Sequence, residues 1–474
     1  MSKVQSIKVE DIVLDSNIYP RINIDHKRVS MFEENMRDGF EFDPIHLQEH
    51  PDEPGKYRIL DGAHRFKACK GIGEKEVKAE IINLNGEDPL LYAASKAIGP
   101  RELKDEEARQ TARKAYRNNP RISSSKVGKA IGRSRQAVDS YISDLRAAIQ
   151  LKHDLILFKM NRLGIPQKKI SERLGVHLKT IYNHISAKMP TMAKLPISDL
   201  KKGFTISQVA EKHDWPVSLV WSVALDGKND HCRFRELQWE IRTWDYWAWN
   251  DCDKRFGDEW PGRIPAQLIA HILYFFSKEN DLVIDPMAGG GVVADTCLAF
   301  NRRCWSFDMI DRPDARPEIA PYFWDFDDLK WPVNPKTKPD LIIFDPPYFS
   351  KKNSEYEEAS ISNLTRDKYL RFLEDFFKLA SENSKKGTRV VMINADWRDF
   401  QSTPALEETS EQSILIDEYI TRIKNAGWDV THIIQAPMSS ERFQANVVAA
   451  MQKKKILGVT SRYVIVAKKQ AEAF

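Results

Sequence analysis

The chain has 474 residues, of which 42% are hydrophobic, and its formal net charge is +4. This length suffices for about three domains, and no apolar run approaches the roughly 18 residues that a membrane-spanning helix needs. The first residues lack an apolar export segment and the five cysteines form no C-x-x-C pair. We therefore expect a reduced cytoplasmic protein without structural zinc or another metal site.

The positive charge is unevenly distributed. Residues 101–190 hold 20 Lys and Arg against 8 Asp and Glu, a surplus of 12 that leaves the rest of the chain at −8. A basic block in a nearly neutral chain is typical of a nucleic-acid-binding segment, and a solvated basic surface is the alternative.

Residues 1 to about 90 predict a small α/β domain. Strands are predicted at Val9–Leu14, Pro44–Gln48 and Tyr57–Leu60, and the first helix is predicted at Arg28–Gly39. After the last strand, Asp61-Gly62-Ala63-His64-Arg65 begins a second helix that runs through Lys70. Backbone amides and a guanidinium at a helix N-terminus predict an anion site.

This region resembles the ParB/sulfiredoxin-like N-terminal domain. The resemblance implies that Gly62, His64 and Arg65 lie near the phosphates of a nucleotide. A nucleotide is therefore an open candidate for a second ligand of the chain. Partition proteins have Arg where this chain has His64, so CTP binding is not carried over. A hydrogen-bonded structural histidine is the alternative for His64.

Residues 91 to about 230 are predicted to be helical, and they contain an internal repeat. Its first copy is Val127, Ile131, Gly132, Val138 and Ile142, and its second, 43 residues later, is Ile170, Leu174, Gly175, Ile181 and Ile185. Apolar residues four apart, a glycine turn and two more apolar residues four apart predict a helix-turn-helix. A third copy, at Val209, His213, Asp214, Val220 and Ala224, lacks the glycine.

The second helix of each pair would contact DNA. The residues it would present are Ser134, Arg135, Gln136 and Asp139 in the first copy and His177, Lys179, Thr180 and Asn183 in the second. Arg and Gln can bond to guanine and adenine edges, whereas Lys more often contacts phosphate. Duplex DNA is therefore the predicted partner. A plain helical bundle or a dimerisation module is the alternative, and a homodimer is left open.

An aromatic segment follows at about 231–262. Its members are Phe234, Trp239, Trp244, Tyr246, Trp247, Trp249, Phe256 and Trp260. They could form a stacking surface near a flipped base, or an interdomain core or cap over the next sheet, which we favour. An amphipathic helix is predicted at Ala266–Phe276.

A glycine motif comes next. The buried strand Leu282–Ile284 is followed by Asp285-Pro286-Met287-Ala288-Gly289-Gly290-Gly291 and a helix at Val292–Phe300. The spacing fits neither G-x-G-x-x-G nor a P-loop. Asp308, at the end of the next strand, lies 23 residues after Asp285, where an acid can bind ribose hydroxyls. Asp325, after Tyr322-Phe323-Trp324, is predicted at the third strand's tip.

A second motif, Asp345-Pro346-Pro347-Tyr348, follows the buried strand Leu341–Phe344. The prolines offer no N–H, which leaves the Asp side chain and backbone carbonyls as acceptors beside one aromatic ring. This arrangement suits a flat ligand that bears an NH2 group. A proline-rich turn with a core tyrosine is the alternative.

The two motifs together resemble the S-adenosylmethionine-dependent amino-methyltransferases of DNA, over roughly the last 230 residues. The resemblance implies a Rossmann-like domain with a mostly parallel seven-stranded sheet. The positions it implies for the cofactor are Asp285, Pro286, Ala288, Gly289, Gly291, Asp308 and Asp325. The positions it implies for catalysis and base stacking are Asp345, Pro346, Pro347, Tyr348 and Phe349.

The remaining elements complete the expected sheet. They are a polar loop at Phe349–Ser362, helices at Tyr369–Ala380 and Ile414–Ala426, a strand at Arg389–Asn394 and an antiparallel pair at Trp428–Gln435 and Arg462–Ala467. The connection Ala436–Ser461 carries Arg442, Lys453, Lys454 and Lys455, so it is either a DNA-contacting segment or a solvated loop.

We therefore predict three domains: 1–90, ParB-like; 91–230, all-helical and DNA-binding; and 231–474, a methyltransferase. The predicted reaction methylates the N6 amine of adenine in duplex DNA, because Asp at the first motif position is the commoner adenine pattern in the family. Cytosine N4, an RNA amine, and a ParB-like regulatory protein that only senses cofactor are the alternatives. No cysteine follows a proline, which argues against a C5 enzyme. No second catalytic motif occurs, which favours a stand-alone or phage- or plasmid-borne modification enzyme over a fused restriction system. We expect such an enzyme to be nucleoid-associated.

Overall fold

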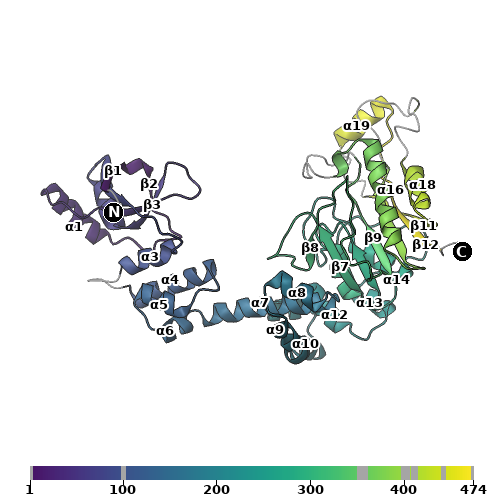
Figure 1. The fold of residues 1–474 in the computed structure, drawn as a ribbon, viewed down its shortest axis with the longest axis horizontal. Helices are drawn as coiled ribbons and strands as arrows, with labels where there is room; N and C mark the ends of the chain where they lie inside the picture. Colours follow the sequence, from purple (N-terminus) through teal and green to yellow (C-terminus); the bar gives the residue numbers. More distant parts are fainter. Residues whose placement is uncertain are drawn as a thin grey trace. The chain divides into compact units, whose positions relative to one another are not determined.

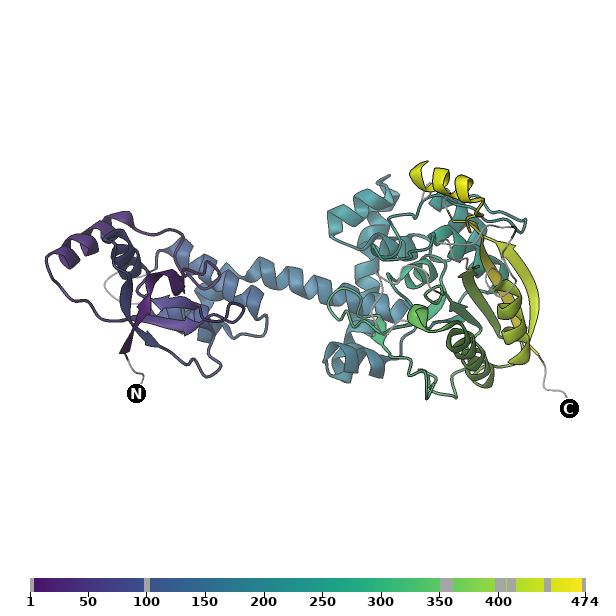
Figure 2. The same cartoon turned by 90° about the horizontal axis from the view of Figure 1, so that it is seen from above.

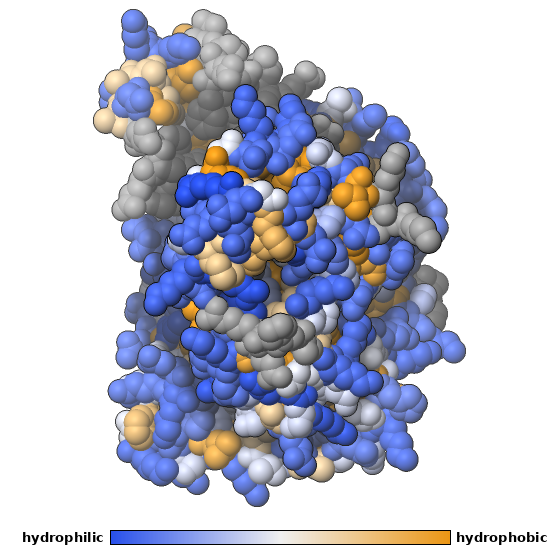
Figure 3. All heavy atoms as spheres, turned by 90° about the vertical axis from the view of Figure 1, so that its left-hand side faces the viewer, coloured by the Kyte–Doolittle hydropathy of each residue, from blue (hydrophilic) through white to orange (hydrophobic). Residues whose placement is uncertain are grey.

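The computed structural model describes residues 4–97, 103–349, 361–396, 406, 415–438 and 445–470. The chain forms two compact units, Met1–His153 and Asp154–Phe474, each with its own hydrophobic core (Figure 1). The face drawn in Figure 3 is mainly hydrophilic, with small separate groups of hydrophobic side chains. Among the described residues, no helix has the length and apolarity to cross a membrane.

The first unit begins with a five-stranded sheet of order β1-β5-β3-β4-β2. Its elements are β1 (Val4–Lys8), η1 (Val9–Asp11), β2 (Ile12–Val13), α1 (His26–Arg37), β3 (Ile45–Glu49), β4 (Tyr57–Asp61), α2 (Ala63–Gly71) and β5 (Glu76–Ile81). The strand expected at Val9–Leu14 is a 3-10 turn followed by two strand residues, whereas β1 and β5 were not predicted. Both are polar strands that bury few apolar side chains, so their sequences carry a weak signal.

Helices complete this unit. They are α3 (Pro89–Lys96), α4 (Asp105–Asn118), α5 (Ser124–Ile131), α6 (Arg135–Tyr141) and the first part of α7 (Ser143–Arg162). Gly132 ends α5 at a φ of 66°, a left-handed conformation that glycine adopts at little cost. Val127, Ile131 and Val138 are buried in one core, so the repeat's apolar residues hold α5 against α6.

The second unit opens with further helices. They are α8 (Gln167–Leu174), α9 (Leu178–Asn183), a π-helical turn η2 (His184–Lys188), α10 (Met189–Lys201), α11 (Ile206–His213), α12 (Val217–Ala224) and α13 (Asp230–Leu237). Gly175 ends α8 as Gly132 ends α5, and Asp214 takes the left-handed position in the third copy, at a φ of 55°. Helix α12 packs against α15 and is buried along most of its length, so it is not available to enter a DNA groove.

A seven-stranded sheet of order β11-β12-β10-β9-β6-β7-β8 forms the rest of this unit. The strands are β6 (Leu282–Asp285), β7 (Arg303–Asp308), β8 (Ile319–Pro321), β9 (Leu341–Phe344), β10 (Arg389–Ala395), β11 (Trp428–Gln435) and β12 (Arg462–Lys469). The helices are α14 (Ala266–Phe276), α15 (Val292–Ala299), η3 (Ile361–Asn363), α16 (Arg366–Glu382), α18 (Ile416–Asn425) and α19 (Ala445–Lys454). Only β12 runs antiparallel to its neighbours, so the sheet is mostly parallel and Rossmann-like, as predicted.

Helices cover both faces of this sheet (Figures 1 and 2). Val283, Leu341 and Ile343 pack toward α14 and α15, whereas Ile284 and Phe344 pack toward α16 and α18. Burial on both faces explains why these strands are continuous apolar runs in the sequence. From β6 the chain proceeds to β7 and β8 on one side and then returns to β9 on the other, which creates a switch point between β6 and β9.

A buried ion cluster fixes the helix that follows the glycine motif. Lys159 Nζ, on α7, lies 2.9 Å from Asp295 Oδ1 and 2.7 Å from Glu318 Oε1. Arg316 Nη1 lies 3.1 Å from Asp295 Oδ2, and Arg316 Nη2 donates a hydrogen bond to the Gly290 carbonyl at 2.8 Å. Burial alone would raise the pKa of Asp295, but Arg316 and Lys159 outweigh it and lower that pKa. The cluster thus ties α7 and α15 to the glycine loop, residues 286–291 between β6 and α15.

We predict that Asp295→Ala lowers the free energy of unfolding of the second unit by about 3–5 kcal/mol, because Lys159 and Arg316 would be left buried without their shared carboxylate. All twelve tryptophans lie between Trp215 and Trp428, so tryptophan fluorescence during denaturation monitors this unit alone. Asp328→Ala, which removes an exposed partner of Lys330, is the control and should cost about 1 kcal/mol or less. Equal effects of the two substitutions would contradict the assignment.

Candidate functional site

The two sequence motifs meet at the switch point of the sheet. Strands β6 and β9 are parallel neighbours, with Ile284 opposite Ile342, so Asp285 and Asp345 lie at the same edge. A cavity of about 1490 Å³ opens there. Its wall includes Trp249, Asn250, Cys252, Trp260–Pro265, Asp285–Gly290, Val292, Val293, Asp308–Ile310, Phe323, Trp324, Phe326, Asp345–Tyr348, Ile361, Met438, Asn446, Val447, Ala450, Met451, Lys454, Ile456 and Arg462.

Asp285 presents an unsatisfied acceptor to this cavity. Its side chain is 1% exposed, and its Oδ2 atom is buried without a hydrogen-bond partner. Burial, followed by the nearby carboxylates of Asp308 and Asp345, raises the pKa of Asp285 well above its usual range. A cationic amine placed against Oδ2 would supply the missing hydrogen bond and would reduce the repulsion between Asp285 and its neighbouring carboxylates.

The glycine loop is held from both sides. Asp308 Oδ2 accepts the N–H of Gly289 at 2.8 Å, and Asp308 Oδ1 accepts that of Ile310 at 3.0 Å. A Cβ atom at Gly289 would lie 2.9 Å from the Trp260 ring, so only glycine fits there. At Gly291, a Cβ would lie 1.9 Å from Arg316 Nη2, which shows that this glycine makes room for a protein side chain.

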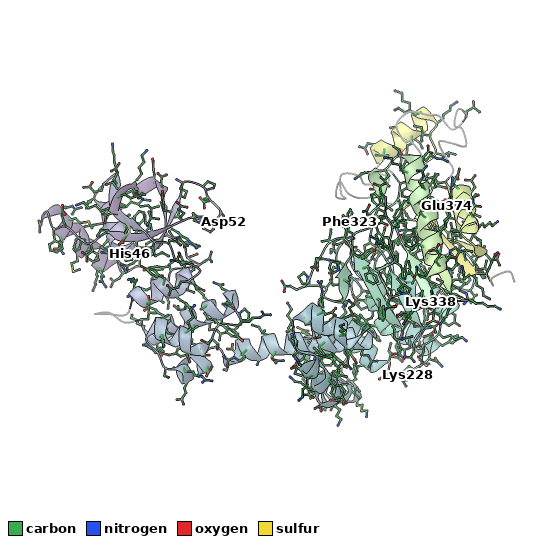
Figure 4. All side chains as sticks on the ribbon, viewed as in Figure 1. His46, Asp52, Lys228, Phe323, Lys338 and Glu374 are labelled. Carbon is green, nitrogen blue, oxygen red and sulfur yellow. The ribbon has the colours of Figure 1, made fainter. Side chains whose placement is uncertain are left out.

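Not every position predicted for the cofactor lies in the cavity wall. Asp285, Pro286, Ala288, Gly289 and Asp308 line it, whereas Gly291 and Asp325 do not. Strand β8 ends at Pro321, earlier than predicted, and Asp325 is an exposed loop residue whose Oδ1 accepts the N–H of Asp327 at 3.1 Å. The same loop instead contributes aromatic side chains to the wall at Phe323 (labelled in Figure 4), Trp324 and Phe326.

Asp345 is the second unsatisfied acceptor. Its Oδ1 atom is buried without a hydrogen-bond partner, and its side chain hydrogen-bonds the hydroxyl of Tyr348. Burial raises the pKa of Asp345 to about 7, although Arg462 and Tyr348 act in the opposite direction. Asp345 therefore titrates near neutral pH.

The proline turn after Asp345 is fixed from behind. Tyr369 Oη donates to the Pro347 carbonyl at 3.2 Å, and Asn394 Nδ2 donates to Tyr369 Oη at 2.8 Å. Pro346, Pro347 and Tyr348 line the cavity, as the motif predicts. Phe349 does not. It is buried, and its ring centroid lies 5.4 Å from that of Tyr369, which indicates a supporting position behind the turn.

Arg462 is a site residue that the sequence analysis missed. It is 6% exposed, lines the cavity, donates from Nε to the Ala436 carbonyl at 3.0 Å and hydrogen-bonds Tyr348. The signal that could have revealed it is the direction of its strand. Because β12 is antiparallel, its first residue lies at the edge where the parallel strands end.

The aromatic segment is divided between core and cavity. Trp247 is buried in the core that packs on α14, whereas Trp249 and Trp260 line the cavity. Trp244 and Tyr246 are 52% and 50% exposed. Much of the segment is therefore core, as we favoured, and two of its indoles face the site.

The predicted DNA-contacting side chains lie on exposed helix surfaces. Arg135 and Gln136 are exposed on α6, and Lys179, Thr180 and Asn183 are exposed on α9. Arg135 Nε lies 3.6 Å from Asp139 Oδ2, one helical turn away. None of these residues is part of the cavity wall.

In the first unit, the side chains of the predicted anion site are hydrogen-bonded to other groups of the protein. Gly62 caps α2 at a φ of 91°. His64 Nε2 accepts the N–H of Asp25 at 3.1 Å, which fits the structural alternative for this histidine. Arg65 donates to Asp61 Oδ2 at 2.7 Å and to the Asp43 carbonyl at 2.8 Å. A phosphate would have to compete with these acceptors for Arg65.

Two family models match this chain. Residues 1–95 match the ParB N-terminal domain, and residues 145–312 match a family described as DNA methylase. The chain thus combines a ParB-like domain with a methyltransferase domain. The second match includes the glycine motif and ends before Asp345. A comparison with curated proteins found no match.

The chain also resembles solved structures at low identity. ParB from Caulobacter crescentus complexed with CTP-gamma-S is 18% identical over 39% of this chain and 88% of that chain, with a TM-score of 0.20. TrmN from Thermus thermophilus is 15% identical over 43% and 48%, with a TM-score of 0.24. A putative sarcosine dimethylglycine methyltransferase from Galdieria sulphuraria is 12% identical over 43% and 85%, with a TM-score of 0.29.

Proposed function

We propose that the second unit transfers a methyl group from S-adenosylmethionine to the N6 amine of adenine in duplex DNA. The match to the DNA methylase family supports this class of reaction. The observation that carries the proposal is the pair of buried, unpartnered oxygens, Asp285 Oδ2 and Asp345 Oδ1, in one cavity. One suits the amino group of a cofactor and the other the amine of a base.

The glycine side of the cavity fits the cofactor, which when bound supplies an electrophilic methyl group on a sulfonium. Asp285 Oδ2 would accept the cationic amine of its methionine part, and the wall around Asp308 would surround its ribose. The cavity volume of about 1490 Å³ exceeds the range of roughly 300–1000 Å³ that is usual for one small ligand. It therefore leaves room for a flipped base beside the cofactor.

The proline side would hold the base. Asp345 Oδ1 and the Pro346 carbonyl would accept the two amine hydrogens, which turns the nitrogen lone pair toward the cofactor. Tyr348 would stack on the base. Because the amine of a paired base lies inside the duplex, the nucleotide must leave the stack, at a cost of a few kcal/mol. Positioning of the two reactants would supply much of the rate enhancement.

The target base distinguishes the proposal from its alternatives. The chain should be incubated with labelled S-adenosylmethionine and either duplex DNA or RNA, and the nucleosides analysed by mass spectrometry. N6-methyladenine from DNA is the expected product. Detection of N4-methylcytosine instead would make cytosine the target base. Methylation of RNA but not of DNA would make RNA the substrate. Absence of methylation would leave the regulatory alternative, a DNA-binding protein that only senses cofactor.

We expect Asp345→Ala to lower the rate of methyl transfer by about 10²–10³-fold or more, because the amine loses its principal acceptor in the transition state. Binding of S-adenosylhomocysteine, measured by calorimetry, should remain within about twofold, since that ligand is assigned to the opposite side of the cavity. Asp429→Ala removes an exposed carboxylate at the start of β11 and serves as the control. A variant at Asp345 with normal turnover would remove the mechanism.

The pKa of Asp345 also predicts a pH dependence. If the ionised form accepts the amine, activity should fall as the pH drops through about 7. Arg462 lowers this pKa, whereas burial raises it. Arg462→Met should therefore move the acidic limb of the pH–rate profile to higher pH, and Arg462→Lys, which keeps the charge, should move it less. An unshifted limb in Arg462→Met would show that Arg462 does not act on Asp345.

For the first unit we propose nucleotide binding at the N-terminus of α2, supported by the ParB family match and by Gly62 and Arg65 at that terminus. Asp61 holds Arg65 in an ion pair. Arg65→Ala should therefore weaken binding of CTP or ATP, and Asp61→Asn should strengthen it. Calorimetry with each nucleotide tests this, and lack of binding by the unmodified chain excludes it. DNA contact by α6 and α9, a homodimer, nucleoid association and the three domain boundaries remain predictions.

A further inference from the structure

Helix α19, Ala445–Lys454, has no buried residue. It lies in the connection between β11 and β12, which was predicted to be either a DNA-contacting segment or a solvated loop, and it stands at the margin of the second unit in both Figures 1 and 2. Val447 and Val448 are 42% and 37% exposed. A ten-residue helix is only marginally stable in water without packing, so an exposed helix of this kind is suited to a contact surface.

One side of α19 faces the candidate active site. The residues of α19 that line the cavity are Asn446, Val447, Ala450, Met451 and Lys454, which recur every three to four positions and so share one helix face. The same cavity contains the acceptors of Asp285 and Asp345. A ligand that fills this cavity can therefore contact both the acceptors and α19.

The end of this helix is strongly basic. Lys453, Lys454 and Lys455 are consecutive and exposed, and residues 445–461 contain no Asp or Glu. Lys453 and Lys455 are absent from the cavity wall, whereas Lys454 is part of it. Positive charge beside this cavity is complementary to the phosphates of DNA.

We propose that α19 is a DNA-contacting helix, whose terminal lysines bind the phosphates that flank the target nucleotide while its cavity face borders the flipped base. The inference rests on the proposed function, since it assigns a partner to the same site. The predicted contact at Arg442 in the same connection lies outside the described residues, as do residues 350–360 of the polar loop.

The test compares two charge-matched variants. Lys453→Gln with Lys455→Gln removes one lysine of α19 and the lysine that directly follows the helix, neither of which lines the cavity. Lys386→Gln with Lys424→Gln removes two exposed lysines that precede β10 and β11, at the opposite edge of the sheet. DNA affinity is measured by fluorescence anisotropy at several salt concentrations, S-adenosylhomocysteine affinity by calorimetry, and oligomeric state by light scattering.

We expect the α19 variant to lose about tenfold in DNA affinity and the dependence of log affinity on log salt to become shallower by about 2, or about 1 for each phosphate contact. The control variant should change by less than about threefold, and S-adenosylhomocysteine should bind both variants equally. Equal DNA affinity and equal salt dependence in the two variants would overturn the inference. Loss of a dimer in the α19 variant alone would assign the helix to a subunit interface and would also overturn it.

Methylation by the unmodified chain is measured in parallel. If that chain methylates DNA and the two variants bind DNA alike, the role of α19 fails and the proposed function stands. If it methylates no nucleic acid while the α19 variant still loses DNA affinity, the proposed reaction fails and only the DNA contact stands.

Discussion

Two buried carboxyl oxygens without hydrogen-bond partners, at the ends of adjacent strands, are the constraint on which the rest of the site depends. Asp285 and Asp345 share one cavity, and burial together with the carboxylates of Asp308 and Asp345 raises the pKa of Asp285. Leaving such acceptors unsatisfied costs free energy in a folded protein unless a ligand supplies the donors. A cationic amine at Asp285 and a neutral amine at Asp345 would satisfy both, which is why the two carboxylates point to a two-substrate reaction.

The surrounding fold stabilises this arrangement from three directions. The ion cluster around Asp295 holds the glycine loop through Arg316. The hydroxyl of Tyr369 fixes the proline turn from behind. The antiparallel strand β12 brings Arg462 beside Tyr348 at the same edge. Each support comes from a different segment of the chain, so the site depends on residues that are far apart in the sequence.

Much of this site could be predicted from the sequence because its signals are local. Strands buried on both faces are apolar runs, and the Asp-Pro-Pro-Tyr turn and the glycine loop follow them directly, so Asp285 and Asp345 could be placed without knowledge of the fold. Arg462 could not be found in that way, because its role depends on the direction of β12. Asp325 was placed at a strand end because three aromatic residues precede it, yet these residues belong to a loop whose rings line the cavity. The lysines near the end of α19 suggested a DNA contact from the sequence, but the helix itself and its place in the cavity wall were not predicted.

A crystal structure of the chain with sinefungin, an amine-bearing cofactor analogue, and a duplex DNA that contains the target sequence would locate both amines directly. We expect the amino acid amine of the analogue within about 3.2 Å of Asp285 Oδ2 and the amine of a flipped base within the same distance of Asp345 Oδ1. An analogue bound away from the glycine loop, or a base whose amine is turned away from Asp345, would contradict this expectation.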